Sequence, residues 1–138
     1  MLRLTKNITN KKLPAGELRP ELAYILCYLS NPNKNDVFLD PFAGYGSIPI
    51  ERARNFPYNL VFASDKNKDF KRIIRDRMKS KKMSKTIIPK VQNALSMQSF
   101  DDEFITKIVT DPPWGFHEKM SYWFLHINVR RVFKSIKT

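Results

Sequence analysis

The sequence predicts an α/β fold in which a parallel β-sheet is flanked by helices. Short apolar runs alternate with segments whose apolar residues recur every three or four positions, a pattern typical of strands joined by helices. The first run leads into a turn with two glycines, and several runs end at a polar residue that could bind a ligand. We expect one domain over residues 14–138, preceded by a polar, basic N-terminal arm over residues 1–13.

The first element of the domain is expected to be an amphipathic helix over residues 19–30. Pro20 suits the first turn of a helix, and apolar residues recur at helical spacing, namely Leu18, Leu22, Ile25, Leu26 and Leu29. Cys27 falls on the apolar side of this helix and is expected to be buried. It is the only cysteine and has no internal disulfide partner, which favours a reducing compartment, the cytoplasm.

A strand over residues 37–40 leads into a glycine turn and a second helix over residues 47–55. Gly44 and Gly46 tolerate backbone dihedrals that other residues avoid, so the chain can approach a ligand closely there. Ser47 is expected to cap the helix, whose start offers unpaired N–H groups. The turn lacks the third glycine of the dinucleotide motif and the lysine of a P-loop. Neither NAD nor a nucleoside triphosphate is therefore the favoured ligand.

The alternation of strands and helices continues to the end of the sequence. Pro89 cannot donate a backbone hydrogen bond, so the strand that contains it is expected at a sheet edge. The helix before that strand has a buried stripe made of Phe70, Ile73, Ile74 and Met78. The remaining expected elements are a strand at 60–65, a helix at 68–81, strands at 86–91 and 107–111, a rigid loop at 112–115 and a helix at 119–136.

Polar residues follow the apolar runs at the places where each strand is expected to end. In a parallel α/β sheet, ligands bind beyond the carboxyl ends of the strands. The sequence therefore predicts one crevice surrounded by the polar side chains of Asp40, Asp65, Asn93 and Asp111.

The charge of the chain favours a polyanionic partner. Lysine and arginine number 25 against 13 acidic residues, a formal net charge of +12, which indicates RNA or DNA before a membrane. No apolar run is long enough to span a membrane. The alternative is a lysine-rich surface with no such partner. The same two interpretations, contact with RNA or a solvated surface, apply to ten basic residues that lie close together in the sequence: Lys66, Lys68, Lys71, Arg72, Arg75, Arg77, Lys79, Lys81, Lys82 and Lys85.

Three segments resemble one family of enzymes. The segment 40–47, DPFAGYGS, resembles the glycine motif of class I S-adenosylmethionine (SAM) methyltransferases. The segment 111–114, DPPW, resembles the motif of enzymes that methylate exocyclic amines of bases. The lead-in, residues 13–23, is similar to the segment before the catalytic domain in guanosine-N2 methyltransferases of tRNA and rRNA, many of which carry a THUMP module.

The resemblance implies a Rossmann-like fold and a set of residues that bind SAM. Gly44 and Gly46 would lie beneath its methionine part, Asp40 near its amino group, Asp65 at the ribose hydroxyls and Asn93 facing the adenine. The full set that the resemblance implies is Arg19, Pro20, Asp40, Pro41, Phe42, Ala43, Gly44, Gly46, Ser47, Asp65, Lys66, Asn93 and Ala94.

The catalytic residues implied by the resemblance are Asp111, Pro112, Pro113 and Trp114. An exocyclic amine is a poor nucleophile because its lone pair is conjugated to the base. Asp111 and the Pro112 carbonyl can each accept one of its N–H bonds, and both bonds strengthen as positive charge develops on nitrogen. Trp114 can stack on the base. The expected target is a looped-out or flipped-out nucleotide.

Several alternatives stay open at this point. The chain could be a DNA adenine-N6 methyltransferase, or an inactive module that binds SAM or RNA. The glycine turn and the Pro-Pro segment could be ordinary turns, and Asp65 could be the N-cap of the helix that follows it. His117 and His126 have no companions with metal-ligand spacing, so no metal is expected.

The resemblance also implies that the sheet is incomplete. Family members carry three more strands after the fourth, whereas this sequence ends after the helix that follows strand 107–111. An open apolar edge is prone to pair with another chain. We therefore expect self-association through that edge.

Overall fold

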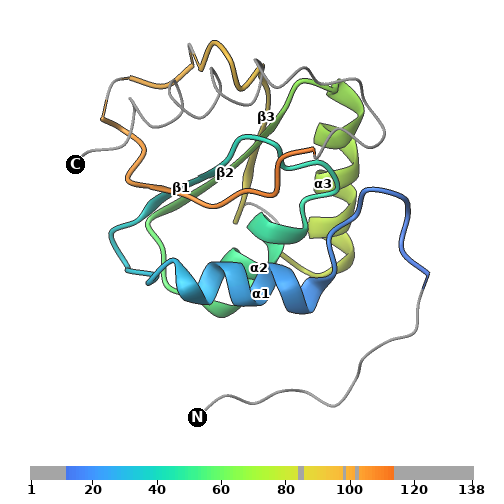
Figure 1. The fold of residues 1–138 in the computed structure, drawn as a ribbon, viewed down its shortest axis with the longest axis horizontal. Coiled ribbons are helices and arrows are strands. Elements are labelled where there is room, and N and C mark those ends of the chain that lie inside the picture. The colour runs from blue at the N-terminus through green and yellow to red at the C-terminus, as the bar shows by residue number, and fades with distance from the viewer. Residues whose placement is uncertain (1–11, 84–85, 98, 102, 114–138) are drawn as a thin grey trace.

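The computed structural model describes residues 12–83, 86–97, 99–101 and 103–113. Strands and helices alternate there as the sequence predicts, and most bounds agree within two residues (Figure 1). The elements in chain order are α1 (Pro20–Leu29), β1 (Val37–Asp40), α2 (Ser47–Asn55), β2 (Leu60–Asp65), α3 (Lys68–Ser80), β3 (Ile88–Val91) and β4 (Lys107–Ile108). The predicted helix at 119–136, Trp114 and residues 1–11 of the arm lie outside the described residues.

The four strands form one parallel sheet in the order β3-β2-β1-β4. β3 lies at an edge, as Pro89 predicts. β4 pairs with β1 only over Lys107 and Ile108, so the predicted strand at 107–111 is too long. Thr110, two residues beyond β4, hydrogen-bonds the Asp40 side chain at the end of β1. No helix in the described part of the chain is long and apolar enough to cross a lipid bilayer.

The two faces of the sheet carry separate apolar cores. The three helices pack on one face, where Phe38 of β1 and Ile74 of α3 are almost fully buried. The other face is covered by the connection between β3 and β4, which contributes Met97 and Ile105. Figure 1 shows α1 and α2 below the strands and this connection above them.

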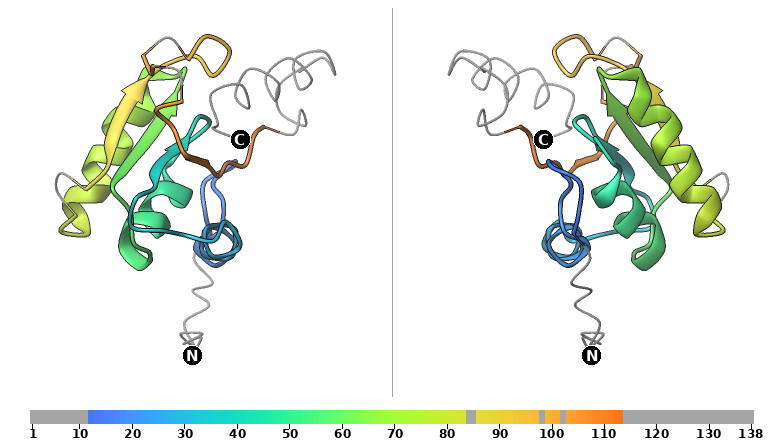
Figure 2. Two further views of the ribbon diagram at one scale, coloured as in Figure 1. Left: turned by 90° about the vertical axis from the view of Figure 1, so that its left-hand side faces the viewer. Right: turned by 90° about the vertical axis from the view of Figure 1, so that its right-hand side faces the viewer.

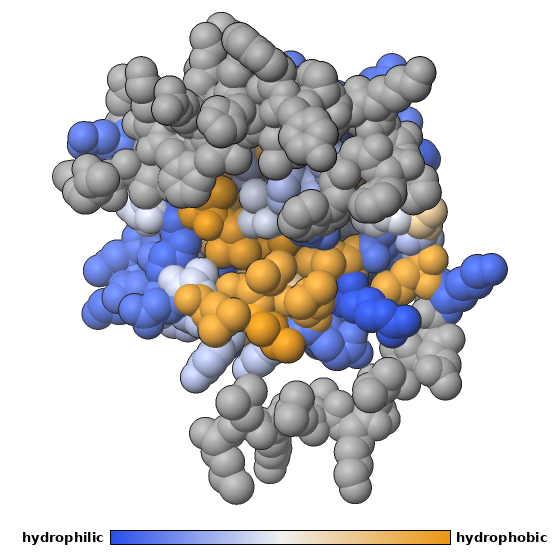
Figure 3. Space-filling model, viewed as in Figure 1, coloured by the Kyte–Doolittle hydropathy of each residue, from blue (hydrophilic) through white to orange (hydrophobic). Residues whose placement is uncertain are grey.

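Helix α1 buries Cys27, as expected, but only part of its predicted apolar stripe: Leu26 packs against the core and other members stay exposed. Its buried residues are Ala23 and Cys27, and burial raises the pKa of the Cys27 thiol to about 12. Leu22, Ile25 and Leu29 stay 46%, 48% and 71% exposed and form the apolar patch over α1 in Figure 3. The small residues face inward because α1 packs closely against α2, where the Cys27 thiol lies 3.6 Å from the Ile48 carbonyl oxygen.

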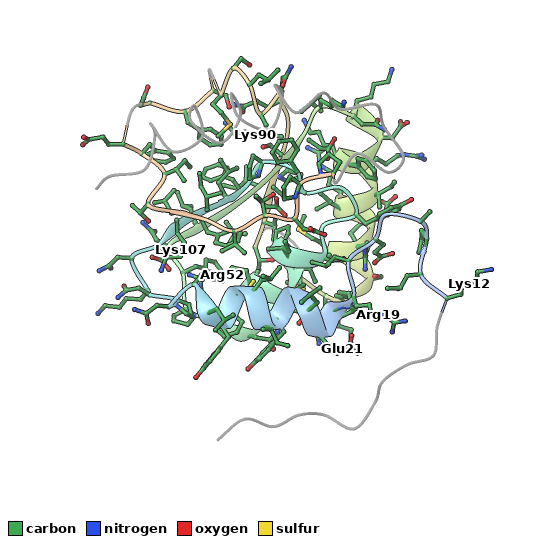
Figure 4. All side chains as sticks on the ribbon, viewed as in Figure 1. Lys12, Arg19, Glu21, Arg52, Lys90 and Lys107 are labelled. Atoms are coloured by element: carbon green, nitrogen blue, oxygen red, sulfur yellow. The ribbon has the colours of Figure 1, made fainter. Side chains whose placement is uncertain are left out.

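A buried ion pair fixes α2 to the start of β1, at the edge opposite the carboxyl ends of the strands. The Arg52 side chain is fully buried, and its Nη2 lies 2.5 Å from Asp36 Oδ2. The Lys107 ammonium lies 3.1 Å from the same oxygen (Figure 4). Arg52 Nε and Nη1 have no hydrogen-bond partner in the described part of the chain. Arg52 therefore depends on Asp36 for the compensation of its charge.

Candidate active site

The glycine turn and the Asp-Pro-Pro segment meet at one rim, although they are about 70 residues apart in sequence. Thr110 Oγ1 donates a 2.7 Å hydrogen bond to Asp40 Oδ1. In Figure 1 the end of the described chain lies beside the turn that follows β1. At the other side of the rim, the Gln92 amide donates to the Asp65 carbonyl at 2.9 Å. The carboxyl ends of the four parallel strands thus lie along the same edge of the sheet.

The two glycines of the turn have different local environments. Both have positive φ angles, +48° at Gly44 and +81° at Gly46. A Cβ on Gly44 would meet no atom within 4 Å, so this glycine borders open space. A Cβ on Gly46 would lie 2.8 Å from Ile74 Cγ1, so this glycine permits the contact between the turn and α3. Only Gly44 leaves room for a ligand above the backbone.

We expect Gly46→Ala to lower the free energy of unfolding by roughly 2–4 kcal/mol, because it combines a strained φ angle with overpacking against Ile74. Gly44→Ala carries the backbone strain alone and should cost roughly 1–2 kcal/mol. Urea denaturation of the two variants provides the comparison. Equal losses would show that the contact with Ile74 contributes nothing.

Asp65 fixes the glycine turn through its carboxylate. Its Oδ2 accepts the Gly44 amide at 3.0 Å, and its Oδ1 accepts the Asn67 amide at 2.9 Å. The N-cap of α3 is Asn67, whose side chain accepts from Asp69 N. The alternative that Asp65 caps this helix is therefore wrong. A carboxylate has about four acceptor sites, so each Asp65 oxygen retains capacity for a further donor.

The Asp40 carboxyl group at the rim is almost fully buried. Desolvation by burial raises its pKa to about 7, against the hydrogen bonds from Thr110 and the Phe42 amide that lower it, while the charges of Asp65 and Asp111 raise it further. The ionised form is therefore held at an energetic cost. A cation placed beside it would relieve that cost.

The free energy of unfolding should fall as the pH rises from about 4 to about 7. The folded-state pKa of about 7 lies above the ordinary value of 3.8, so the folded protein keeps a proton that the unfolded chain releases over this interval. The slope from Asp40 is up to about 1.4 kcal/mol per pH unit. Urea midpoints across this range should decline more for the natural chain than for Asp40→Asn. If the urea midpoints of the natural chain and of Asp40→Asn change with pH in the same way, Asp40 is not the group responsible.

Ser47 does not cap α2. The N-cap is Gly46, and no side chain makes a capping hydrogen bond there. Ser47 is the first residue of the helix, and its Oγ is buried without a partner in the described part of the chain. The start of α2 thus combines the N–H groups of a helix N-terminus with a buried hydroxyl that has no partner among the described residues.

A cavity of about 540 Å³ lies between the lead-in segment, the glycine turn and α3. Arg19 and Pro20 line it, together with Tyr45 from the turn (Figure 4 labels Arg19). Its inner wall is held by Arg77, whose Nη1 lies 2.7 Å from Glu17 Oε1 and donates to the Tyr45 carbonyl at 2.8 Å.

Arg77 is a positioning residue that the sequence analysis counts only among the basic residues of α3. It follows Phe70 and Ile73 at seven and four positions, so it lies on the packed side of the helix. That spacing was the signal that could have identified it. Because it links the lead-in to the turn, it shapes the cavity wall.

The other predicted site residues also lie near the rim. Asn93 follows β3, is exposed, and its Oδ1 accepts the Leu95 amide at 2.9 Å. Ala94 is buried, and Lys66 is exposed beside Asp65. Pro41 and Ala43 are buried and Phe42 is half-buried within the turn, while Asp111 and Pro112 are half-buried and Pro113 is exposed.

Comparison with known proteins agrees with this arrangement. Over 100 residues the chain is 36% identical to a probable tRNA (guanine(10)-N2)-dimethyltransferase of Methanothermococcus thermolithotrophicus. The aligned region covers 69% of this chain and 60% of that relative. Over 50 residues it is 42% identical to the tRNA (guanine(6)-N(2))-methyltransferase THUMP3 of Mus musculus, covering 36% of the chain and 10% of that protein.

The crystal structure of TrmN from Thermus thermophilus superposes with a TM-score of 0.75 at 25% identity, over 89% of this chain and 36% of that one. The chain thus spans 60% or less of the length of these relatives. The fold is that of class I methyltransferases. The family model described as UPF0020, RMKL-like methyltransferase domain, matches residues 8–137, and the chain therefore belongs to this methyltransferase family.

Proposed function

We propose that the chain is a SAM-dependent methyltransferase domain that acts on the N2 amine of guanosine in RNA, tRNA before rRNA. Membership in the methyltransferase family and the activities for which the two tRNA-modifying relatives are named support this proposal. The observation that carries it is the hydrogen bond between Thr110 and Asp40. It holds the segment expected to bind the amine beside the turn expected to hold the methyl donor.

The residues around the glycine turn fit SAM, which when bound supplies an electrophilic methyl group. Gly44 leaves open space for the methionine part. The unpartnered Ser47 hydroxyl at the start of α2 suits its carboxylate, and buried Asp40 suits its ammonium group. The remaining acceptor sites of Asp65 suit the ribose hydroxyls.

Further SAM-binding roles in the proposal rest on the positions of the residues around the rim. Asn93 and Ala94 follow β3 on the side expected for the adenine, and Lys66 adjoins Asp65. Arg19 and Pro20 form the outer wall through the cavity that they line. Pro41, Phe42 and Ala43 shape the backbone of the turn with Gly46.

The Asp111 carboxylate and the Pro112 carbonyl are proposed to hold the two N–H bonds of the target amine. These acceptors favour the state in which the nitrogen has become pyramidal and partly positive, so they act on the transition state. Pro113 stiffens the segment by fixing its φ angle. Trp114 is proposed to stack on the base and hold its plane in place.

Nucleoside analysis tests the proposed reaction. The chain is incubated with methyl-labelled SAM and an unmodified tRNA transcript, a ribosomal RNA fragment or a DNA duplex. We expect label in N2-methylguanosine from tRNA. Label in N6-methyladenine of DNA would replace the proposal with a DNA methyltransferase, and binding of S-adenosylhomocysteine (SAH) without label in any substrate would replace it with an inactive binding module.

We also propose that the chain self-associates through the open side of the sheet. Its proposed location is the cytoplasm. In the described residues, β4 pairs only with β1, and the exposed apolar patch of α1, made of Leu22, Ile25 and Leu29, provides further surface to bury. Sedimentation equilibrium should show a dimer that Ile25→Lys/Leu29→Lys weakens at least roughly tenfold. A natural chain that stays monomeric at high concentration would contradict this.

A further inference from the structure

The exposed face of α3 carries a stripe of basic side chains. They recur at positions i, i+4, i+7 and i+11, which places them on one line along the helix. All four are exposed. The residues of this basic stripe are Lys68, Arg72, Arg75 and Lys79.

The basic stripe is not neutralised by the acidic residues of the same helix. Asp69 and Asp76 are seven positions apart and lie on a neighbouring line of the surface. In the described part of the chain, no residue of the stripe has an ion-pair partner. Arg77 on the opposite line differs, because it pairs with Glu17 and is only 28% exposed. The exposed basic side chains of α3 (Lys68–Ser80) therefore lie along one line.

The stripe begins next to the rim and runs away from it. α3 starts at Lys68, three residues after Asp65. From Lys68 to Lys79 the stripe extends about 16 Å at 1.5 Å per residue. α3 lies on the outside of the molecule and faces the viewer in the right-hand view of Figure 2. An extended polyanion could thus lie along the stripe while one of its nucleotides reaches the rim.

We propose that the basic stripe binds the phosphate backbone of the RNA whose target nucleotide enters the rim. This inference rests on the proposed function and adds the surface that holds the substrate outside the catalytic residues. Arginine forms bidentate hydrogen bonds with phosphate, and each neutralised phosphate releases counterions, which gives the stripe a measurable salt dependence. The net charge of +12 adds a general attraction but no direction.

The test compares two variants with equal change in charge. Arg72→Gln/Arg75→Gln removes two charges from the stripe. Lys34→Gln/Arg54→Gln removes two exposed charges, one from the loop before β1 and one from the end of α2. Binding of a fluorescent tRNA transcript to the full 138-residue chain is measured by anisotropy at several salt concentrations. The stripe variant should bind roughly tenfold more weakly near 0.1 M salt, with a log–log salt slope smaller by about 1.4–1.8.

Equal losses in the two variants would overturn the inference, because net charge alone would then explain binding. An unchanged salt slope in the stripe variant would also overturn it. The same holds if the natural chain does not bind the transcript, or if a DNA duplex competes more strongly than RNA. Calorimetry with SAH is run in parallel and should give the same affinity for both variants. A chain that binds tRNA through the stripe but does not bind SAH would refute the proposed function and support only the contact between the stripe and the RNA backbone.

Discussion

Asp36→Ala is expected to lower the free energy of unfolding by roughly 3–5 kcal/mol, because it leaves the Arg52 guanidinium buried without a counter-charge. Arg52 is fully buried, and two of its nitrogens already lack a partner in the described residues. The same substitution removes the ion pair to Lys107 and the acceptor of the Asn33 amide. Urea denaturation at neutral pH, monitored by circular dichroism, measures the loss.

Two further variants make the result specific to the buried charge. Asp36→Ala/Arg52→Met removes both charges and should recover most of the lost stability. Glu51→Gln breaks the pair with the 47%-exposed side chain of Arg54 and should cost less than about 1 kcal/mol. A loss for Asp36→Ala as small as that for Glu51→Gln, or no recovery in the double variant, would mean that Arg52 is compensated in another way.

Asp111→Ala is expected to reduce the rate of methyl transfer to tRNA by roughly 10²–10³-fold, because it removes one of two acceptors proposed to strengthen in the transition state. The affinity for SAH should stay within about twofold, since no cofactor contact is assigned to Asp111. Single-turnover transfer of labelled methyl gives the rate, and calorimetry gives the affinity.

The matched control is Asp101→Ala, which removes an exposed acid from the connection between β3 and β4. It should leave the rate unchanged. If both variants slow transfer equally, the effect reflects general charge. If Asp111→Ala weakens SAH binding in proportion to the rate, Asp111 acts on the cofactor.

The periodicity of the sequence was sufficient to predict the described elements and their order along the chain. Pro89 marked an edge strand correctly, and Phe70, Ile73, Ile74 and Met78 marked the packed stripe of α3. The periodicity was only partly right on α1, because spacing alone cannot tell which residues of an apolar stripe pack inward. A close helix contact buries Ala23 and Cys27, Leu26 packs partly against the core, and Leu22, Ile25 and Leu29 stay exposed. β4 is shorter than its apolar run: the register with β1 covers Lys107 and Ile108, and Val109 adds one backbone hydrogen bond to Leu39.

The positions of the candidate site residues at the strand ends were predictable, and the contacts between loops were less so. The rule that parallel strands place their carboxyl ends together brought Asp40, Asp65 and Asp111 to one rim. The exchange of roles at the helix starts was not predictable: Gly46 and Asn67 are the N-caps in place of Ser47 and Asp65. A cap depends on backbone angles at one residue, which the pattern of polar residues does not determine.

The most direct measurement is a crystal structure of the chain with SAH. The account predicts that the methionine part lies against Gly44 with its amino group at Asp40, that the ribose hydroxyls contact Asp65, and that the sulfur faces the segment beginning at Asp111. Density for SAH at the opposite edge of the sheet, or a rim closed by packed side chains at full SAH concentration, would contradict it.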